Sequence, residues 1–175
     1  MNYQEFIEEG TNLVKLQSGF INHEDYNTIH KNSVVVCHDV LIKYDDGTKK
    51  GFLLIKRNKE PAKGYYYPVG GRMLRGLSCK ESLEKKVKEE CSLTLSAVTH
   101  IDVARTMFQQ DPFGHGKGTD TLNLIFIANG EGTLSLDGNH DAYCIVDKET
   151  LPVVGEQLDD YVKAIFKKID SNNLW

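Results

Sequence analysis

The sequence has no long apolar run, no paired-cysteine motif and no excess of positive charge. No hydrophobic stretch approaches the roughly twenty residues that a membrane span needs, and we recognise no secretory leader. The four cysteines have no CxxC spacing, which argues against structural zinc and favours buried free thiols in a reducing compartment. We therefore expect a cytoplasmic protein without a membrane partner.

Basic residues are outnumbered, with 21 Lys and Arg against 25 Asp and Glu and a net charge of −4. Nucleic acids and anionic membranes attract basic surfaces, so neither is an expected partner. A local basic patch is nevertheless present, formed by Lys56, Arg57, Lys59, Lys63 and Arg72. It suits a small ligand that carries phosphate groups.

A chain of 175 residues suits one domain, and its 40% hydrophobic content is enough for a core. We see no internal repeat, low-complexity tract or linker. Hydrophobic periodicity predicts a short helix at 2–14, interrupted near Gly10, and further helices at 22–31, 78–91 and from about 155. It predicts strands at 33–44, 51–57, 97–108, 121–129 and after a turn at 137–140. This order, with a hairpin formed by the first two strands, indicates an α+β or mixed α/β class.

The stretch 56–93 holds most of the candidate chemistry. A basic, aromatic loop leads to Gly70 and Gly71, whose missing Cβ atoms let the backbone approach a ligand closely. Ser78, with Glu81 three residues later, predicts a capped helix start. Glu89 and Glu90 on that helix could hold a hard cation such as Mg²⁺, which prefers oxygen ligands. The alternative is a solvated Lys/Glu helix face.

Other polar residues have two interpretations each. Asp39 interrupts an apolar strand, so it lies either at the strand's edge or in a site, because a buried charge needs partners. The three tyrosines 65–67 could stack on a base or sugar, or could simply pack their loop down. The Gly-rich segment 109–120 could close over a ligand or be a plain flexible loop.

Residues 71–93 match part of the Nudix box, the pattern G-x5-E-x7-R-E-U-x-E-E-x-G-U in which U is apolar. The matching positions are Gly71, Lys85 (in place of Arg), Val87, Glu89, Glu90 and Leu93. Leu77 and Lys86 stand where the pattern has glutamates, and Ser92 stands where it has the late glycine. The stretch resembles a degenerate Nudix box, which implies a Nudix fold with a mixed β-sheet packed between helices.

A wider resemblance is to the GDP-mannose mannosyl hydrolase branch of the Nudix family. The segments that carry it are 24–44, 56–72 and 139–143, and the similarity spans roughly residues 20–166. It implies an N-terminal extension at 1–19, a Nudix hydrolase domain at 20–175, and a homodimer. In this branch, water attacks the anomeric carbon of the sugar with inversion and the nucleoside diphosphate leaves, so the resemblance implies a nucleotide-sugar substrate.

The resemblance also implies roles for particular residues. The ligands of Mg²⁺, or of Mn²⁺ in its place, would be the Gly70 carbonyl and the side chains of Glu90 and Asn139, where the branch has Gln at the last position. The catalytic residues would be His140 as the base, Arg57 and Asp39. The substrate would be bound by Arg57, Arg72 and Tyr65.

Two alternatives stay open at this stage. One is an ordinary Nudix pyrophosphohydrolase that uses Glu89 and Glu90 and releases a nucleoside monophosphate. The other is a non-catalytic Nudix domain that binds a nucleotide sugar or a protein, which the departures at Leu77, Lys86 and Ser92 favour. Lys86 could pair with Glu90 and abolish metal binding, or could point to solvent or toward a phosphate.

Overall fold

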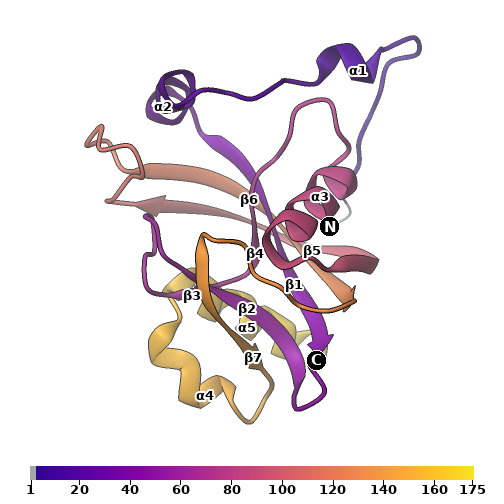
Figure 1. Ribbon diagram of the computed structural model, residues 1–175, viewed down its shortest axis with the longest axis vertical. Helices are drawn as coiled ribbons and strands as arrows, with labels where there is room; N and C mark the ends of the chain where they lie inside the picture. Colours follow the sequence, from indigo (N-terminus) through magenta and orange to yellow (C-terminus); the bar gives the residue numbers. More distant parts are fainter. Residues whose placement is uncertain (1–2) are drawn as a thin grey trace.

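The computed structural model describes residues 3–175, in which a seven-stranded mixed sheet has helices on both faces (Figure 1). The helices are α1 (Leu13–Leu16), α2 (His23–Asn32), α3 (Cys79–Cys91), α4 (Leu151–Val154), the 3-10 helix η1 (Gly155–Gln157) and α5 (Asp160–Ser171). The strands are β1 (Val35–Asp45), β2 (Lys50–Arg57), β3 (Tyr66–Tyr67), β4 (Val69–Arg72), β5 (Thr94–Phe108), β6 (Thr119–Glu131) and β7 (His140–Val146). The predicted α+β class, a mixed sheet between helices, is confirmed.

Strand β1 is the centre of the sheet. It runs parallel to β6 and antiparallel to β2, with which it forms the predicted hairpin. Only the C-terminal part of β1, from Ile42, pairs with β2, whereas residues 37–40 pair with β4. Strands β2 and β4 therefore separate along β1, and the loop that joins β2 to β3 begins beside this opening.

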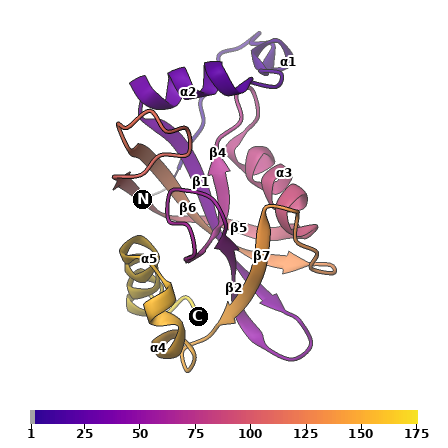
Figure 2. The ribbon, with the colours of Figure 1, turned by 60° about the vertical axis from the view of Figure 1, so that its left-hand side comes forward.

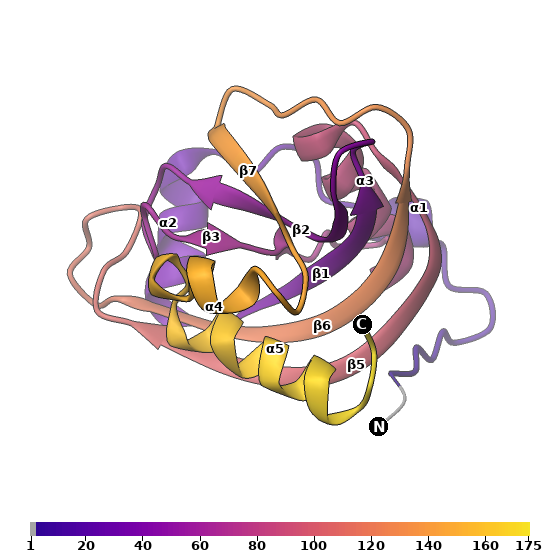
Figure 3. The same cartoon turned by 90° about the horizontal axis from the view of Figure 1, so that it is seen from below.

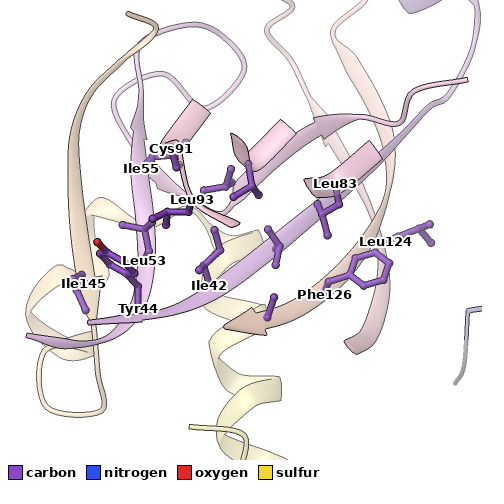
Figure 4. Packing of buried hydrophobic residues seen from close by; sticks show 14 of the residues in the cluster. Ile42, Tyr44, Leu53, Ile55, Leu83, Cys91, Leu93, Leu124, Phe126 and Ile145 are labelled. Atoms are coloured by element: carbon purple, nitrogen blue, oxygen red, sulfur yellow. The ribbon is translucent and has the colours of Figure 1, made fainter. Parts of the chain in front are cut away.

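Alternation along the strands divides the core into two clusters. Val40 and Ile42 of β1 face α3 and pack with Leu83 and Val87 (Figure 4), whereas Leu41 packs in the cluster that contains α5. Helices α3 and α5 accordingly lie on opposite faces of the sheet (Figures 2 and 3). The same alternation places Asp39 on the face of α5.

Helix α3 forms as its sequence predicts. The Ser78 hydroxyl accepts a hydrogen bond from the Glu81 amide while the Glu81 carboxylate accepts one from the Ser78 amide, which completes a capping box. Ser92 ends the helix in the left-handed region, at φ 59°. The apolar residues at helical spacing are fully buried, so the opposite face of α3 is free to present its charges.

The helix expected at 2–14 is wrong for the described residues, because only Leu13–Leu16 are helical and residue 2 lies outside the described part. Gly10 adopts a φ of +82°, which breaks a helix. The segment lies against the body of the domain instead (Figure 1). Its Glu5 carboxylate accepts a hydrogen bond of 2.7 Å from the Cys79 amide at the start of α3, and the Leu16 carbonyl accepts one from Arg75.

The cysteines are free thiols, three of them buried and Cys144 half-buried. Burial raises the pKa of Cys79 and Cys91 to about 12, so both stay protonated at neutral pH. Within residues 3–175, no helix is both long and apolar enough to cross a bilayer.

Candidate active site

A cavity of about 780 Å³ opens where β2 and β4 separate from each other along β1. Its size is in the range of small-molecule sites, which are about 300–1,000 Å³. The predicted site residues that line it are Asp39, Arg57, Gly70, Arg72, Glu90, Asn139 and His140. Tyr65 is exposed and does not line the cavity, whereas Tyr67, two residues later, is buried and does.

Strand register explains why residues far apart in the sequence meet here. Asp39 of β1 is the ladder partner of Gly70 of β4, and Arg57 of β2 is the partner of His140 of β7. A Cβ at Gly70 would clash with the His38 carbonyl oxygen and the Asp39 carboxylate. Glycine is therefore required at this position for the β4 backbone to approach Asp39.

Asp39 is held by helix α5 across the sheet face. The Tyr161 hydroxyl donates a 2.6 Å hydrogen bond to Asp39 Oδ2. Burial raises the pKa of Asp39 to about 6, although the Tyr161 hydrogen bond and the nearby Arg57 charge favour the carboxylate. Asp39 can thus exchange a proton near neutral pH, and the interpretation of Asp39 as a site residue rather than an edge residue fits its position.

His140 has a carboxylate partner that the sequence did not single out. Its Nδ1 lies 2.7 Å from Asp137 Oδ1. Burial favours the neutral form of Asp137, but the Asn139 amide and His140 hydrogen bonds outweigh it and lower the Asp137 pKa. Because an ionised carboxylate only accepts, Nδ1 carries a proton toward Asp137, and Nε2 is the ring nitrogen that does not contact Asp137. This arrangement orients an imidazole as a general base.

Two guanidinium groups are available to an anion in the cavity. Arg57 lies 5.2 Å from the Tyr67 ring centre and donates through Nε to the Pro61 carbonyl, while Arg72 lies 4.9 Å from the Tyr26 ring centre. Neither arginine forms an ion pair with a carboxylate in residues 3–175. Aromatic contacts orient a guanidinium but do not neutralise it, so both charges remain for phosphate oxygens.

The two side chains to which the resemblance assigns a metal both contact ammonium groups, whereas Glu89 lines the same cavity. Lys86 Nζ lies 2.9 Å from Glu90 Oε1, and Lys59 Nζ donates a 2.9 Å hydrogen bond to Asn139 Oδ1. In the described part of the chain, no group of three or more His, Cys, Asp and Glu side chains could hold a metal ion. A divalent ion about 4 Å from an ammonium is disfavoured by about 8 kcal/mol at an effective dielectric of about 20, and by less where water screens it. The residues as arranged do not fit Mg²⁺ or Mn²⁺.

A polar network on β5 and β6 also lines the cavity, and sequence reasoning missed it. The Asn123 amide nitrogen donates to Thr106 Oγ1 at 3.1 Å, and the Thr106 and Thr121 hydroxyls lie 2.6 Å apart. Asn123 is buried and is the ladder partner of Cys37 on β1. The sequence does hold a signal for Asn123. It is an amide inside an apolar strand and, like Asp39, it needs hydrogen-bond partners when buried.

The Gly-rich segment forms one rim of the cavity, beneath α2 (Figure 2). Phe113 packs edge-on against Tyr26 and His30, with ring centres 5.2 and 5.1 Å apart, and His30 Nδ1 lies 2.8 Å from His115 Nε2. The Asp111 carboxylate accepts backbone hydrogen bonds from Phe113, His115 and Gly116. The segment is therefore a folded loop anchored to α2.

No protein-family model matches this sequence, but solved structures resemble it in fold. The MutT protein from Methanosarcina mazei Go1 aligns with a TM-score of 0.61 at 23% identity, over 80% of this chain and 95% of that one. The NUDIX domain of Shewanella oneidensis NrtR, solved with ADP ribose, aligns with a TM-score of 0.60 at 10% identity, over 87% and 99%. The chain adopts the Nudix fold. A bifunctional NMN adenylyltransferase/ADP ribose pyrophosphatase from Francisella tularensis, solved with AMP and manganese, aligns with a TM-score of 0.59 at 11% identity, over 79% of this chain and 42% of that one.

The Nudix fold places the box helix α3 as one wall of the cavity. Gly71, Lys86, Glu89 and Glu90 of the degenerate box all line it. Lys86 and Glu90 form an ion pair at the two positions where the pattern has glutamates.

Proposed function

We propose that this chain hydrolyses a nucleoside diphosphate derivative, and specifically a nucleotide sugar of the GDP-mannose type. Water attacks the anomeric carbon, and the products are the free sugar and the nucleoside diphosphate. The observation that supports this most is the His140–Asp137 pair, which lies beside Arg57 in the cavity.

His140 acts as the general base in this reaction. Its Nε2 takes a proton from the attacking water while Asp137 stabilises the imidazolium that results. The water oxygen forms the new bond to the anomeric carbon. The bond from that carbon to the diphosphate oxygen breaks, and its electron pair leaves with the nucleoside diphosphate.

Arg57 and Arg72 neutralise the charge that grows on the departing diphosphate. Both line the cavity and both lack carboxylate partners in the described residues, so their guanidinium groups can bind phosphate oxygens in pairs. The resemblance implies Mg²⁺ or Mn²⁺ in addition. Because the donor set does not fit a divalent ion, no step of the proposed reaction passes through one.

Structural neighbours support the class of ligand. One Nudix-fold neighbour was solved with ADP ribose and another with AMP, both of which are nucleotide derivatives. The cavity of this chain has groups that suit a nucleotide derivative. Arg57 and Arg72 would bind its phosphates, and the polar network around Asn123 would bind its hydroxyl groups. Tyr67, whose ring lies 5.2 Å from the Arg57 guanidinium, takes the role in substrate binding that the resemblance assigned to Tyr65.

The test is to identify the products from a panel of nucleotide sugars, including GDP-mannose and GDP-glucose, by ³¹P NMR. We expect a nucleoside diphosphate and the free sugar. Release of a nucleoside monophosphate would contradict the proposal and indicate a pyrophosphohydrolase. An Asp137→Asn variant should retain substrate binding but lose turnover by about tenfold or more, because the imidazole loses its orienting carboxylate.

A second candidate is a domain that binds a nucleotide sugar without turnover. The Lys86–Glu90 ion pair favours it, because Glu90 is the box carboxylate that a hydrolase of the ordinary type would use. This candidate predicts saturable binding of GDP-mannose, measured by calorimetry, with no product after prolonged incubation.

A further inference from the structure

Two lysines occupy the oxygen atoms at which the resemblance places a metal ion. Lys86 comes from the box helix α3 and Lys59 from the loop after β2, so the two ammonium groups approach from different elements. Each binds one of the expected ligand oxygens at 2.9 Å, Lys86 at Glu90 and Lys59 at Asn139. All four residues line the same cavity.

The position of Lys86 is built into the backbone. Gly71 has a φ of +147°, a conformation that favours glycine, and a Cβ there would lie 3.2 Å from Lys86 Cε. The lysine stem thus lies across a glycine that leaves room for it. Its partner Glu90 is largely buried, with a side chain only 11% exposed, so an uncompensated carboxylate there would be unfavourable.

The charges of the two lysines match those of a metal complex. A divalent ion bound by Glu90 and Asn139 would leave a net charge of +1, because Asn139 is neutral. Lys86 and Lys59 on the same two side chains also leave +1. An ammonium has three donors, so each lysine keeps hydrogen atoms for phosphate oxygens after binding its protein partner.

Lys86 shares the cavity with the two arginines. Arg57, Arg72 and Lys86 all line it. A diphosphate group bound there has three cationic side chains within the same cavity without a metal.

We propose that Lys86 and Lys59 together replace the divalent cation of this Nudix site, so that the chain binds a nucleoside diphosphate group without a metal. The inference rests on the proposed function, in that the cavity must bind such a group. We expect Lys86 to contribute more than Lys59 to the binding of the diphosphate, because the Lys86–Glu90 ion pair is more buried than the exposed Lys59–Asn139 contact.

The test measures GDP binding by calorimetry, in EDTA and in millimolar Mg²⁺, on the full chain. Wild type should bind equally well, within about twofold, in both. Lys86→Gln should weaken binding in EDTA by about tenfold or more, and Lys59→Gln by less, because buried charges contribute more than exposed ones. Mg²⁺ or Mn²⁺ should restore binding to the double variant Lys86→Gln/Lys59→Gln, since Glu90 and Asn139 are then both free. Lys86→Arg should retain binding in EDTA.

Lys80→Gln is the matched control, because Lys80 lies on the same helix, is 67% exposed and does not line the cavity. It should bind GDP as wild type does. Circular dichroism would establish that each variant is folded.

A second readout separates this inference from the proposed function. Mn²⁺ titrated into nucleotide-free protein and followed by electron paramagnetic resonance should show no tight site in wild type and one site in Lys86→Gln/Lys59→Gln. Tight Mn²⁺ binding by wild type, or GDP binding that requires a metal, would overturn the inference and leave the proposed function standing. Absence of GDP binding by wild type in both buffers would overturn both.

Discussion

The two walls of the cavity differ in what they retain of the Nudix pattern. The α3 wall keeps its cap, its buried apolar face and its glycine turn, but its carboxylate Glu90 is neutralised by Lys86. The β2–β7 wall carries no box residue, yet it holds His140 beside Arg57. Asp137, which orients His140, lies in the loop before β7, and its amide donates a hydrogen bond to the Glu90 carbonyl of α3. The comparison teaches that a helix with a degenerate family motif can keep its structural role, while the reaction we propose assigns the chemistry to residues outside that motif.

The largest effect should come from the β2–β7 wall. His140→Ala removes the group that takes a proton from water, so turnover of the nucleotide sugar should fall by about 10²–10⁴-fold. The midpoint of thermal unfolding is measured as well, because the His140 side chain is only 13% exposed and its removal leaves Asp137 without that partner. Steady-state kinetics and a thermal melt measure the two quantities. Near wild-type turnover would remove the assigned role of His140 and, with it, the contrast between the walls.

On the α3 wall we expect substitutions to lower the stability of the fold more than they lower turnover. Leu83→Ala empties a fully buried position and should lower the free energy of unfolding by about 2–5 kcal/mol. Turnover per folded molecule should change less than in His140→Ala. Urea denaturation provides the measurement, with exposed Lys80→Ala as the control that should shift stability by about 0.5 kcal/mol or less. If turnover per folded molecule fell as far in Leu83→Ala as in His140→Ala, α3 would take part in the chemistry, which would contradict the comparison.

Asp39 lies between the walls and gives a pH dependence. Its folded-state pKa of about 6 exceeds the unfolded value of 3.8, so the protonated form stabilises the fold below pH 4 and this contribution is lost as pH rises through about 6. Asp39→Asn should therefore raise the free energy of unfolding at pH 8, by on the order of 3 kcal/mol at most. The difference from wild type should shrink toward pH 4, and denaturant melts across that range would measure it. A variant less stable than wild type at pH 8 would contradict the buried, disfavoured charge.

The smallest effect should come from the cap of α3. Ser78→Ala removes one hydrogen bond to the Glu81 amide and should lower the free energy of unfolding by about 0.5–2 kcal/mol. Ser78→Thr is the matched control, because threonine also caps. Equal stability of Ser78→Ala and wild type in urea would show that packing alone places the box helix.

Local patterns predicted those parts of the fold whose cause is local. The cap at Ser78, the buried spacing of α3 and the β1–β2 hairpin all depend on neighbours in sequence, and all are confirmed. The N-terminal helix was wrong because it has no apolar face to bury and Gly10 interrupts it. Helices of that length depend on tertiary packing, which the sequence of the segment does not show.

The sequence indicated most of the residues that line the cavity, but not which of their side chains contact each other. Seven of the eight proposed site residues line one cavity, which resemblance to a known family made possible. The sequence left three orientations open for Lys86: toward Glu90, toward solvent or toward a phosphate. An i, i+4 spacing permits the contact with Glu90 but does not require it. Tyr65 was preferred over Tyr67 because an irregular loop has no period from which to infer the buried side.

Oxygen transfer from labelled water tests the central claim most directly. The protein would hydrolyse GDP-mannose in H₂¹⁸O, and ³¹P NMR together with mass spectrometry would locate the label. Attack on the anomeric carbon predicts ¹⁸O in the mannose and none in the GDP. Label on phosphorus would contradict the account, because water would then have attacked the diphosphate and the β2–β7 wall would not direct it to the sugar.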